Sequence, residues 1–463
     1  MAFDLIVIGS GPGGYVAAIR ASQLGMKVAI AERAEVGGIC LNWGCIPTKS
    51  LLKSAQVLDY VNHAADYGIM INGEIEADFP KVIERSRAVS DGMSKGVQFL
   101  MKKNKIEVIR GFAKIIRSGQ IEVTDPEGKT SRYETRNIII ATGARSRELP
   151  DLKQDGKKII GYREALTLES RPDSMLVVGS GAIGTELASF YNTMGTAVTL
   201  VEFMPQIVPN EDEEVSKALA RALKKSGIKI LTDATVESVD TTGEVCIVNI
   251  RTKKGVETRE VDIVLSSVGI SPNTENIGLD EAGVKTEKSY IIVDEFYRTN
   301  LEGVFAIGDV IQGIALAHVA SAEGIICVEK IAGRMPEPLD YKNIPACTYT
   351  SPEVASVGFT EKQAEEAGYD IKTGKFPYTA SGKASAAGAK DGFIKLIFDA
   401  KHGELLGAHM IGANVTEMIA EIVVARKLEI TGEELIKSVH PHPTMSEAIM
   451  EAAAAAYGEV IHL

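Results

Sequence analysis

Cysteine is scarce in this sequence, and the marks of exported, nucleic-acid-binding and membrane-spanning proteins are missing from it. Five of the 463 residues are cysteine, and so small and odd a number excludes a disulfide framework. No apolar run approaches the roughly 18 residues that a membrane helix needs, and the first residues lack the basic and apolar segments of a secretion signal. Acidic residues outnumber Lys and Arg by 62 to 50 without a basic cluster, which disfavours nucleic acid or an anionic membrane as a partner. We therefore predict a soluble, cytoplasmic protein with no membrane span.

The composition that remains is that of an ordinary globular protein rich in glycine. Hydrophobic residues make up 45% and charged residues 24% of the chain, which excludes a disordered or fibrous protein. At roughly 100–200 residues per domain, the length suggests about three domains. The 44 glycines hold the most informative pattern.

A short apolar strand followed by a glycine-rich turn occurs twice. The first copy is Leu-Ile-Val-Ile-Gly-Ser-Gly-Pro-Gly-Gly over residues 5–14, and the second is Leu-Val-Val-Gly-Ser-Gly-Ala-Ile-Gly over 176–184. In each copy a helix is predicted next (15–24 and 185–194), followed by a strand (28–31 and 198–201) that ends in an acid. The distance from first glycine to acid is 23 residues in both copies, from Gly9 to Glu32 and from Gly179 to Glu202.

This order of strand, glycines, helix, strand and acid predicts a dinucleotide site in each copy. The first glycine permits a tight turn, the second lets a pyrophosphate approach the backbone, and the third lets the helix pack against the strand. The helix N-terminus favours the phosphates, and the acid accepts hydrogen bonds from ribose hydroxyls. The residues are Gly9, Gly11, Gly14 and Glu32 in the first copy, and Gly179, Gly181, Gly184 and Glu202 in the second.

Further predicted strands indicate the domain order of an α/β protein. They cover 137–141 before Thr142 and Gly143, 262–268 before Gly269, and 304–307 before Gly308 and Asp309. We predict two Rossmann-like domains, the first discontinuous over 1–148 and 271–342 and the second inserted as 149–270, followed by a C-terminal domain over 343–463.

Cys40 and Cys45 lie among glycines between the first acid and the next helix. In a straight helix their Cα atoms would be about 8.7 Å apart, whereas a disulfide needs about 4.4–6.8 Å. A bridge therefore requires a departure from helix geometry, which Gly44 and Pro47 allow. A strained bridge at the start of a helix is of the redox-active kind. The alternative is two reduced cysteines that pack as small hydrophobic residues.

The segment Gly37-Gly38-Ile39-Cys40-x4-Cys45-Ile46-Pro47-x-Lys49, after the first dinucleotide pattern, resembles the flavin-dependent disulfide reductases of the glutathione reductase and dihydrolipoamide dehydrogenase class. The resemblance spans nearly the whole chain. It implies FAD in the first domain, a nicotinamide nucleotide in the second, and a C-terminal α+β dimerisation domain. It also implies a helix opening at 316–320 towards the flavin, and Lys49 near the flavin ring, paired with Glu186; a merely structural ion pair is the alternative. The implied FAD residues are Gly9, Gly11, Gly14, Glu32, Lys49, Thr142, Gly143, Asp309 and Ala317, and the implied nucleotide residues are Gly179, Gly181, Gly184, Glu202 and Gly269.

The C-terminal run His440-Pro-His442-Pro-Thr-Met-Ser-Glu447 resembles the His-Pro-Thr-x-x-Glu pattern of this class. The resemblance implies that His442 is the acid/base and Glu447 its orienting partner. A group that titrates near neutrality suits the deprotonation of a thiol. Thr444 and Glu447 also fit a capping box that opens a helix over 445–456, and both roles can coexist. We interpret His440 as a spacer or surface residue. The remaining candidates are interpreted as structural, solvated or inert: His63, His402, His409, His462, Cys246, Cys327 and Cys347.

Residues 203–207, which follow Glu202, contain no arginine, so the carboxylate would repel a 2′-phosphate and NAD is predicted rather than NADP. With this preference, the cysteine pair and a tail without cysteine, the chain most resembles the dihydrolipoamide dehydrogenases. That resemblance implies a homodimer, in which His442 and Glu447 reach the partner's Cys40 and Cys45. It also implies a lipoyl group carried on another protein, either a lipoylated E2 acyltransferase or the glycine cleavage H protein.

Three points stay open. Gly269-Ile270-Ser271 departs from the Gly-Arg-x-Pro-Asn pattern of many relatives, which leaves one nucleotide contact undecided. The chain could instead be an NADH-dependent reductase of another small disulfide, or a flavoprotein subunit that only docks and whose dithiol is idle.

In the favoured mechanism a dihydrolipoamide thiol, deprotonated by His442, attacks Cys40 and leaves Cys45 as a thiolate on the flavin side. No metal site is predicted.

Overall fold

The computed structural model describes residues 2–463, and the chain forms two compact units. The first unit holds the chain up to Ser50 together with Pro80–Arg147 and Gly269–Leu339. The second holds Leu51–Phe79, Glu148–Val268 and Asp340–Leu463. The three domain boundaries that the sequence suggests stay predictions, since the compact units group the chain differently.

A parallel sheet forms the core of the first unit. Its strand order is β3-β2-β1-β6-β19, and all neighbours are parallel. The strands are β1 (Phe3–Ile8), β2 (Val28–Glu32), β3 (Glu107–Arg110), β6 (Thr130–Ile140) and β19 (Val304–Ala306). Every residue of β2 is buried, as expected of a strand covered on both faces.

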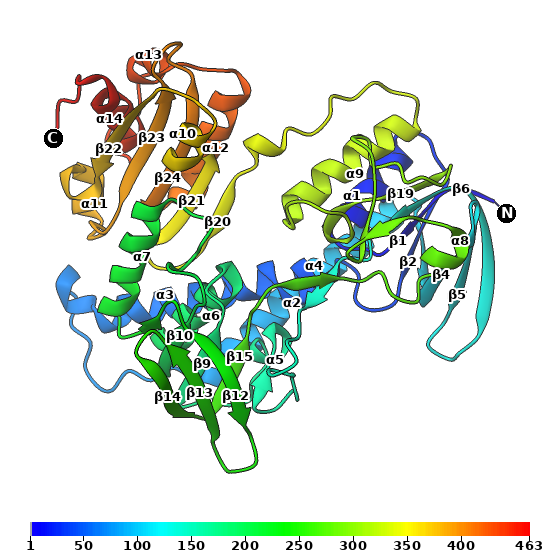
Figure 1. The fold of residues 1–463 in the computed structure, drawn as a ribbon, viewed down its shortest axis with the longest axis horizontal. Coiled ribbons are helices and arrows are strands. Elements are labelled where there is room, and N and C mark those ends of the chain that lie inside the picture. Colours follow the sequence, from blue (N-terminus) through cyan, green and yellow to red (C-terminus); the bar gives the residue numbers. More distant parts are fainter. Residues whose placement is uncertain (1) are drawn as a thin grey trace. The chain divides into compact units, whose positions relative to one another are not determined.

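Two helices pack side by side in this unit (Figure 1), α1 (Pro12–Gln23) and α9 (Ala317–Ile331). Glycine permits their close approach. A Cβ on Gly13 would lie 3.1 Å from the Ala320 carbonyl oxygen, and one on Gly324 would lie 2.8 Å from the Gly13 carbonyl oxygen. The sequence predicts the opening of α9 correctly, whereas α1 begins three residues earlier than expected, because Gly13 and Gly14 lie inside its first turn.

The other elements of the first unit surround this core. The long strand β6 also pairs antiparallel with β5 (Gln120–Thr124), which pairs with β4 (Phe112–Arg117). The short strand β7 (Ala144–Ser146) pairs with β16 (Ile270–Pro272). The remaining elements are α2 (Gly38–Trp43), the start of α3 (Cys45–Asn62), most of α4 (Phe79–Lys103), α8 (Leu279–Ala282), β17 (Thr286–Glu287), β18 (Tyr290–Ile291) and the 3-10 turn Gly308–Val310.

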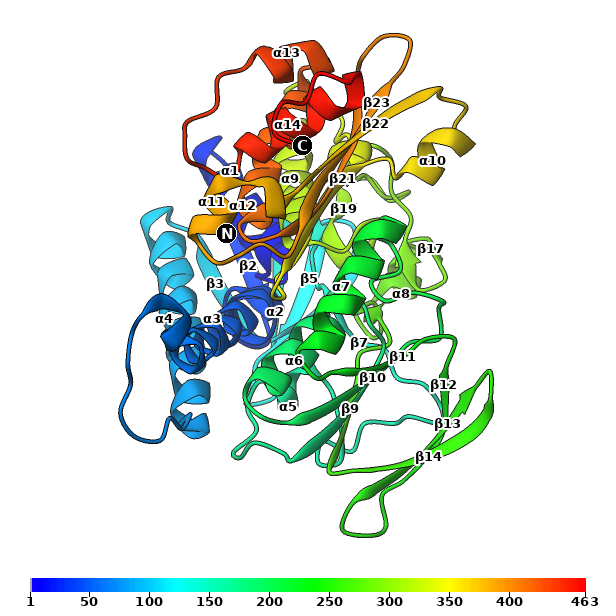
Figure 2. The same cartoon turned by 90° about the vertical axis from the view of Figure 1, so that its left-hand side faces the viewer.

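The second unit contains a second parallel sheet, ordered β11-β10-β9-β15-β8. Figure 2 shows it with α6 and α7 and with the antiparallel sheet β12-β13-β14. The bounds are β8 (Ile159–Ile160), β9 (Ser174–Val178), β10 (Ala197–Val201), β11 (Lys229–Leu231), β15 (Ile263–Ser266), α5 (Tyr162–Ala165), α6 (Ala182–Thr193), α7 (Glu213–Lys225), β12 (Thr235–Asp240), β13 (Cys246–Thr252) and β14 (Gly255–Val261). The two parallel sheets with crossover helices confirm the predicted pair of Rossmann-like folds.

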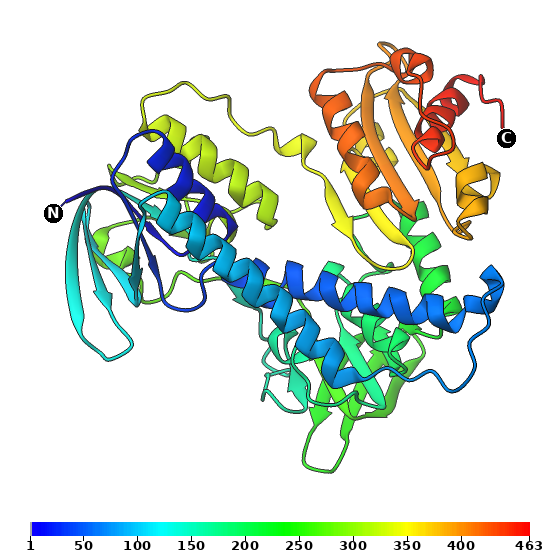
Figure 3. The ribbon, with the colours of Figure 1, turned by 180° about the vertical axis from the view of Figure 1, so that it is seen from behind.

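The C-terminal part of the second unit is an antiparallel sheet ordered β20-β21-β24-β23-β22. Helices α12 and α14 pack on one of its faces around an apolar core (Figure 3). The bounds are β20 (Ala346–Thr348), β21 (Glu353–Gly358), β22 (Ile371–Pro377), β23 (Phe393–Asp399), β24 (Leu405–Gly412), α10 (Glu361–Glu366), α11 (Gly382–Ala386), α12 (Val415–Lys427), α13 (Gly432–Lys437) and α14 (Glu447–Tyr457). This is the α+β arrangement that the resemblance implies. In the part of the chain that the structure describes, no helix is long and apolar enough to cross a membrane.

Candidate active site

The first glycine loop joins β1 to α1 and has the geometry of a dinucleotide cradle. Gly9 has φ +99°, and a Cβ there would lie 2.3 Å from the Ala141 carbonyl oxygen. A Cβ on Gly14 would lie 2.0 Å from the carbonyl oxygen of Gly9. A Cβ on Gly11 meets no atom within 4 Å. Two glycines are thus required by packing, and the middle one faces open space where a pyrophosphate can approach the backbone.

Glu32, at the end of β2, is buried and bound to this loop. Its Oε2 accepts hydrogen bonds from the Ser10 N–H at 2.8 Å and the Ser10 hydroxyl at 2.7 Å. Its Oε1 accepts a bond from the Ala34 N–H at 2.8 Å. These bonds fix the carboxylate beside the loop, and Oε1, which accepts a single bond, keeps a lone pair for a ribose hydroxyl.

The second loop, between β9 and α6, repeats the first closely. Gly179 has φ +95°, and a Cβ there would lie 2.4 Å from the Ser267 carbonyl oxygen. A Cβ on Gly184 would lie 2.0 Å from the Gly179 carbonyl oxygen, and one on Gly181 meets no atom within 4 Å. Glu202 Oε2 accepts bonds from the Ser180 N–H and hydroxyl at 2.8 and 2.6 Å. The residues present therefore fit two dinucleotides, one at each loop.

The cysteine pair lies where two helices meet. The first, α2, ends at Trp43, Gly44 breaks the helix with φ −144° and ψ −108°, and α3 begins at Cys45. The chain thus departs from a straight helix at the residue where the sequence predicts it. A Cβ on Gly44 would lie 3.3 Å from the Ile39 carbonyl oxygen, so glycine allows the tight approach. Cys40 is half-buried and Cys45 is exposed.

The thiols interact with each other and with charged neighbours. The hydrogen bond to Cys45, then burial, then the charge of Cys45 raise the pKa of Cys40 well above its ordinary value, while Lys49 acts in the opposite direction. Cys40 therefore holds its proton in the reduced pair. Cys45 is the first residue of α3, where the helix N-terminus favours negative charge.

Two further side chains of the first unit lie within electrostatic range of Cys40. Burial raises the pKa of Asp309, and this carboxyl in turn helps to raise the pKa of Cys40. Burial and then Cys40 raise the pKa of Tyr15. The sequence predicts a role for Asp309 but gives none to Tyr15. The only sequence feature that could have indicated Tyr15 is its position directly after the first glycine loop.

The other residues expected at the FAD site lie at ends of strands and helices in the first unit. Thr142 donates its hydroxyl to the Asn273 carbonyl at 2.7 Å, and the Asn273 N–H donates to the Gly143 carbonyl at 2.8 Å. Ala317 is the first residue of α9. The helix N-terminus is thus where the resemblance implies it. The assignment of these residues to FAD stays a prediction.

Gly269 opens the returning segment of the first unit and has φ +110°. A Cβ there would lie 3.9 Å from the guanidinium carbon of Arg147, and the Arg147 N–H donates to the Gly269 carbonyl at 2.9 Å. A basic side chain therefore lies beside the position where the sequence lacks the arginine of many relatives. No pattern in the sequence singles out Arg147.

His442 and Glu447 form the expected pair in the second unit. The His442 Nδ1 lies 2.8 Å from Glu447 Oε1, and Glu447 Oε2 accepts the Thr444 N–H at 2.7 Å. Burial alone would raise the pKa of Glu447, but the Thr444 N–H and His442 outweigh it and lower that pKa. The carboxylate thus orients the ring and caps the chain at once. The helix α14 begins at Glu447 rather than at residue 445, because the Thr444 hydroxyl bonds Pro441 and completes no capping box.

The interpretation of His440 as a spacer or surface residue is wrong. Its side chain is only 6% exposed, and its Nε2 lies 2.8 Å from Glu421 Oε1 on α12. Its Nδ1 lies 2.9 Å from the Ser438 carbonyl oxygen. The hydrogen bond to Glu421 raises the pKa of His440 against the effect of burial. His440 therefore anchors the segment that carries His442.

Glu186 is a buried residue of α6 and accepts the Tyr349 N–H at 3.0 Å. Lys49 is half-buried on α3. The two residues belong to different compact units, and their pairing stays a prediction.

The interpretation of the remaining histidines and cysteines as structural, solvated or inert agrees with their burial. Cys246, Cys327 and His409 are buried, His63, His402 and His462 are exposed, and Cys347 is half-buried. Among the described residues, no cluster of His, Cys, Asp and Glu is arranged to hold a metal ion.

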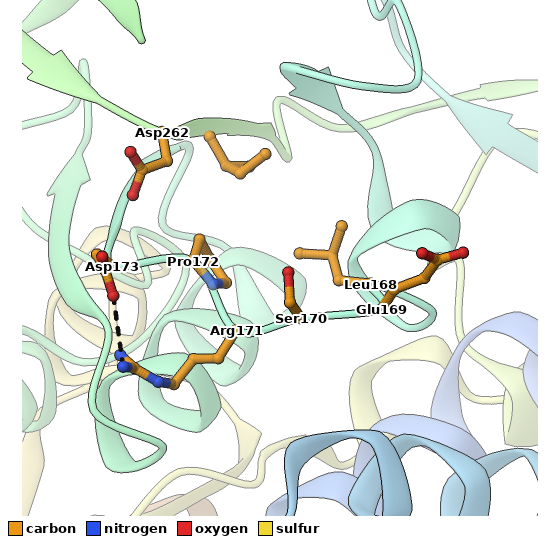
Figure 4. Close-up of a pocket in the computed structure, with 8 residues that line it drawn as sticks. Leu168, Glu169, Ser170, Arg171, Pro172, Asp173 and Asp262 are labelled. Carbon is orange, nitrogen blue, oxygen red and sulfur yellow. Dashed lines mark hydrogen bonds and ion pairs between the residues drawn. The ribbon is translucent and has the colours of Figure 1, made fainter. Parts of the chain in front are cut away.

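A shallow pocket of about 350 Å³ opens on the second unit, lined by Leu168–Asp173, Asp262 and Ile263 (Figure 4). Arg171 within it is held by the Gly195 carbonyl at 2.6 Å and by Asp173 at 3.4 Å. None of the predicted site residues lines this pocket.

Both the sequence and the fold of this chain match those of known proteins. Residues 3–324 match the family described as pyridine nucleotide-disulphide oxidoreductase, and residues 344–453 match the dimerisation domain of that family. The chain is 50% identical to a dihydrolipoyl dehydrogenase of Zymomonas mobilis over 99% of both chains, and 44% identical to that of Bacillus subtilis, also over 99% of both. Among solved structures, LpdA of Mycobacterium tuberculosis superposes with a TM-score of 0.90 at 28% identity, covering 97% of this chain and 98% of that one. The HOCl-induced flavoprotein disulfide reductase RclA of Escherichia coli has a TM-score of 0.87 at 26% identity, covering 97% and 99%.

Proposed function

The chain belongs to the pyridine nucleotide-disulphide oxidoreductase family, and we propose that it is a dihydrolipoyl dehydrogenase, which oxidises protein-bound dihydrolipoamide and reduces NAD⁺. The family is one of flavoprotein disulfide oxidoreductases and uses FAD and NAD(H), as the sequence predicts. One observation supports this reaction in particular: two interacting thiols lie at a helix N-terminus, in the same compact unit as a dinucleotide loop. Two relatives of that name are each 50% identical over 99% of the chain.

The two loops have separate roles in this proposal. The loop with Gly9, Gly11 and Gly14 binds FAD, with Glu32 on its ribose, and the loop with Gly179, Gly181 and Gly184 binds NAD, with Glu202 on its ribose. FAD, when bound, takes two electrons from a dithiol and delivers them as a hydride to the nicotinamide. The protein supplies the dithiol, the base and the orientation of both dinucleotides.

The thiol chemistry follows from the side chains. His442 takes the proton of a dihydrolipoamide thiol at Nε2, because its Nδ1 is engaged by Glu447. The thiolate attacks Cys40 Sγ of the oxidised pair, the bond between the cysteines breaks, and Cys45 leaves as a thiolate. The second substrate thiol then displaces Cys40, and its proton passes to the Cys40 sulfur, so lipoamide departs and both electrons stay in the protein dithiol. The raised pKa of Cys40 supports this division, since Cys40 departs as a thiol and Cys45 keeps the charge.

The proposed assembly is a homodimer with shared active sites. A domain of the dimerisation type covers 344–453. In the same unit the single chain leaves apolar side chains in solvent: Val439, three residues before His442, is 96% exposed, and Leu428, which follows α12, is 73% exposed. A second copy covering this surface would bring His442 and Glu447 to the partner's Cys40 and Cys45.

The partner protein and the cellular compartment are also part of the proposal. The lipoyl substrate is attached to another protein, either a lipoylated E2 acyltransferase or the glycine cleavage H protein, and the enzyme works in the cytoplasm. Capture of lipoylated proteins on the immobilised homodimer, followed by their identification, would name the host complex.

The test compares disulfide substrates on the purified holoenzyme. We expect NAD⁺ reduction with dihydrolipoamide, and a kcat/KM for lipoamide with NADH that exceeds those for cystine and glutathione disulfide by about 100-fold or more. High turnover of another small disulfide with little lipoamide activity would instead identify an NADH-dependent reductase of that disulfide. Titration of thiols before and after reduction by NADH should give two new thiols per flavin. No new thiols would mean that the dithiol is idle.

A further inference from the structure

A lysine is buried in the C-terminal sheet and surrounded by three carboxylates. Lys395, in the middle of β23, is 3% exposed. Its Nζ lies 3.0 Å from Asp212 Oδ2, 3.1 Å from Glu214 Oε1 and 2.6 Å from Glu361 Oε2. Burial of an ammonium group is costly unless it is paired, and this one is paired three times. Asp212 and Glu214 come from outside the sheet, at the start of α7.

Lys395 belongs to a polar row across the sheet, on the face opposite the apolar core. Strand register places it beside His409 on β24 and Lys375 on β22, and His409 lies beside Ser356 on β21. The neighbours of these residues along each strand point into the core under α12 and α14. The polar row therefore contributes nothing to that core. It holds α7 against the sheet, because Lys395 pairs with Asp212 and Glu214 at the start of α7. The helix α7 also contacts β24 (Figure 1).

The segment that this contact fixes begins at Glu202 and ends at Asp212, and it returns to the second glycine loop on the way. The Val208 N–H donates to the Ser180 carbonyl at 3.1 Å, and Ser180 in turn binds Glu202. Val208 is buried and has φ +40°, a left-handed conformation that a β-branched residue adopts only when its surroundings impose it. At the other end, Asp212 caps α7 by accepting the Glu214 N–H at 3.0 Å.

From this geometry we propose that Lys395 is a positioning residue for the nicotinamide nucleotide. It clamps Asp212 to the C-terminal sheet and so holds Val208 against Ser180 and keeps Glu202 in place for the ribose. The inference rests on the proposed nucleotide role of Glu202. Without the ammonium group of Lys395, the carboxylates of Asp212, Glu214 and Glu361 repel one another. The segment 202–212 then relaxes, and Val208 leaves its left-handed conformation. Nucleotide affinity then falls, while the FAD loop and the cysteine pair, which lie in the other compact unit, keep their geometry.

The experiment measures NADH binding to the holoenzyme by fluorescence, together with KM for NAD⁺ and kcat. The variant Lys395→Met keeps the length of the side chain and removes its charge. The gentler Asp212→Asn keeps a helix cap, since Asn caps as well as Asp, but loses the ion pair. We expect Kd and KM to rise about tenfold in Lys395→Met and about threefold in Asp212→Asn, with kcat within about twofold and the bound-flavin spectrum unchanged.

Lys375→Met is the matched control. Lys375 is the next lysine of the same row and pairs with Glu214 at the surface, so its loss leaves the three contacts of Lys395 intact. Its Kd for NADH should stay within about twofold of the wild type. Lys395→Met can also impair folding. If the Lys395→Met protein is not recovered in folded form, the Kd of Asp212→Asn for NADH decides whether the positioning role holds.

The outcomes separate the inference from the proposed function. A raised Kd in the clamp variants with an unchanged control supports the positioning role. A lower melting temperature with unchanged Kd and KM in Lys395→Met and Asp212→Asn would overturn it and leave a merely structural ion pair. A wild-type protein that binds no NADH would overturn the proposed function, and the inference with it.

Discussion

Glu202 Oε2 accepts two hydrogen bonds from one residue, Ser180, through its N–H at 2.8 Å and its hydroxyl at 2.6 Å. Glu32 and Ser10 make the same pair of bonds in the first loop. The carboxylate of Glu202 is therefore held in a fixed position, 4% exposed, and cannot swing away from a ligand that it repels. The residues after it, 203–207, bring no arginine.

NAD should accordingly be preferred to NADP by a wide margin, about 100-fold or more in kcat/KM. The cause is the repulsion between Glu202 and a 2′-phosphate in a partly desolvated site. Glu202→Gln should narrow the gap, mostly by weakening NAD, because a neutral amide binds the ribose hydroxyls less strongly than a carboxylate does. The amide also no longer repels the 2′-phosphate. Steady-state kinetics with both nucleotides measure this, and equal kcat/KM values in the wild type would refute the assignment of Glu202.

Cys45→Ser should retain FAD and the fold and lose lipoamide turnover by about 1,000-fold or more, since neither the disulfide nor the thiolate at the start of α3 can form. Electron flow from NADH to an artificial acceptor should persist, because that route bypasses the dithiol. The control is Cys246→Ser. Cys246 is a buried residue of β13 and belongs to the other compact unit, so its replacement leaves Cys40 and Cys45 unchanged. Near wild-type lipoamide turnover in Cys45→Ser would contradict the disulfide mechanism.

Glu447→Gln should lower kcat with lipoamide about 10- to 100-fold, because a neutral amide stabilises the imidazolium of His442 less than a carboxylate does. The Thr444 N–H keeps an acceptor in the amide oxygen, so the melting temperature should change little. Glu433→Gln, an exposed carboxylate of α13, serves as the control. An unchanged kcat for Glu447→Gln would leave Glu447 as a cap alone.

Glu211 should make stability depend on pH. Burial raises the pKa of Glu211 to about 7, although the hydrogen bond to Ser356 lowers it; the charge of Asp212 is a smaller contribution that also raises it. The Oε2 atom of Glu211 is shielded from solvent. The folded protein keeps the proton between about pH 4.5 and 7, where the unfolded chain has lost it. This group therefore makes the folded state less stable as pH rises through that window, and its unfavourable contribution is constant above it. Glu211→Gln should match the wild type near pH 4.5 and exceed it by about 1–3 kcal/mol at pH 8.

Melting temperatures of both proteins at pH 5, 6, 7 and 8 measure this difference. A gap between variant and wild type that does not widen from pH 5 to 7 would show that Glu211 is ionised in the folded protein throughout.

Shared active sites predict complementation between two inactive variants. Cys45→Ser and His442→Gln homodimers should each be nearly inactive. When their subunits are mixed equally by mild denaturation and refolding, about half of the dimers are mixed, and each mixed dimer has one intact site of two. Activity should then recover to about one quarter of the wild-type value if the sites act independently. If the dithiol and the base acted within one chain, mixing would restore nothing.

Much of the site could be predicted from local sequence. The 23-residue spacing, the three glycines and the terminal acid determined both loops, because a tight turn and close packing of helix on strand admit only glycine at Gly9, Gly14, Gly179 and Gly184. The helix break between Cys40 and Cys45 was required by the distance a disulfide spans. His442 and Glu447 are five residues apart, so their contact was within reach of the local chain.

The tertiary structure decided what depends on residues far apart in the chain. His440 is buried because Glu421, 19 residues away on α12, approaches its ring, and no local pattern encodes that approach. Tyr15 reaches Cys40 through the packing of the first unit. Lys395 looks like an ordinary polar residue in a strand, and its role depends on strand register and on carboxylates some 180 residues earlier. Sequence thus determined the parts whose geometry the backbone fixes locally, since spacing and steric demand act within a few residues. Register and packing decided the rest, because they depend on which distant segments come together when apolar surface is buried.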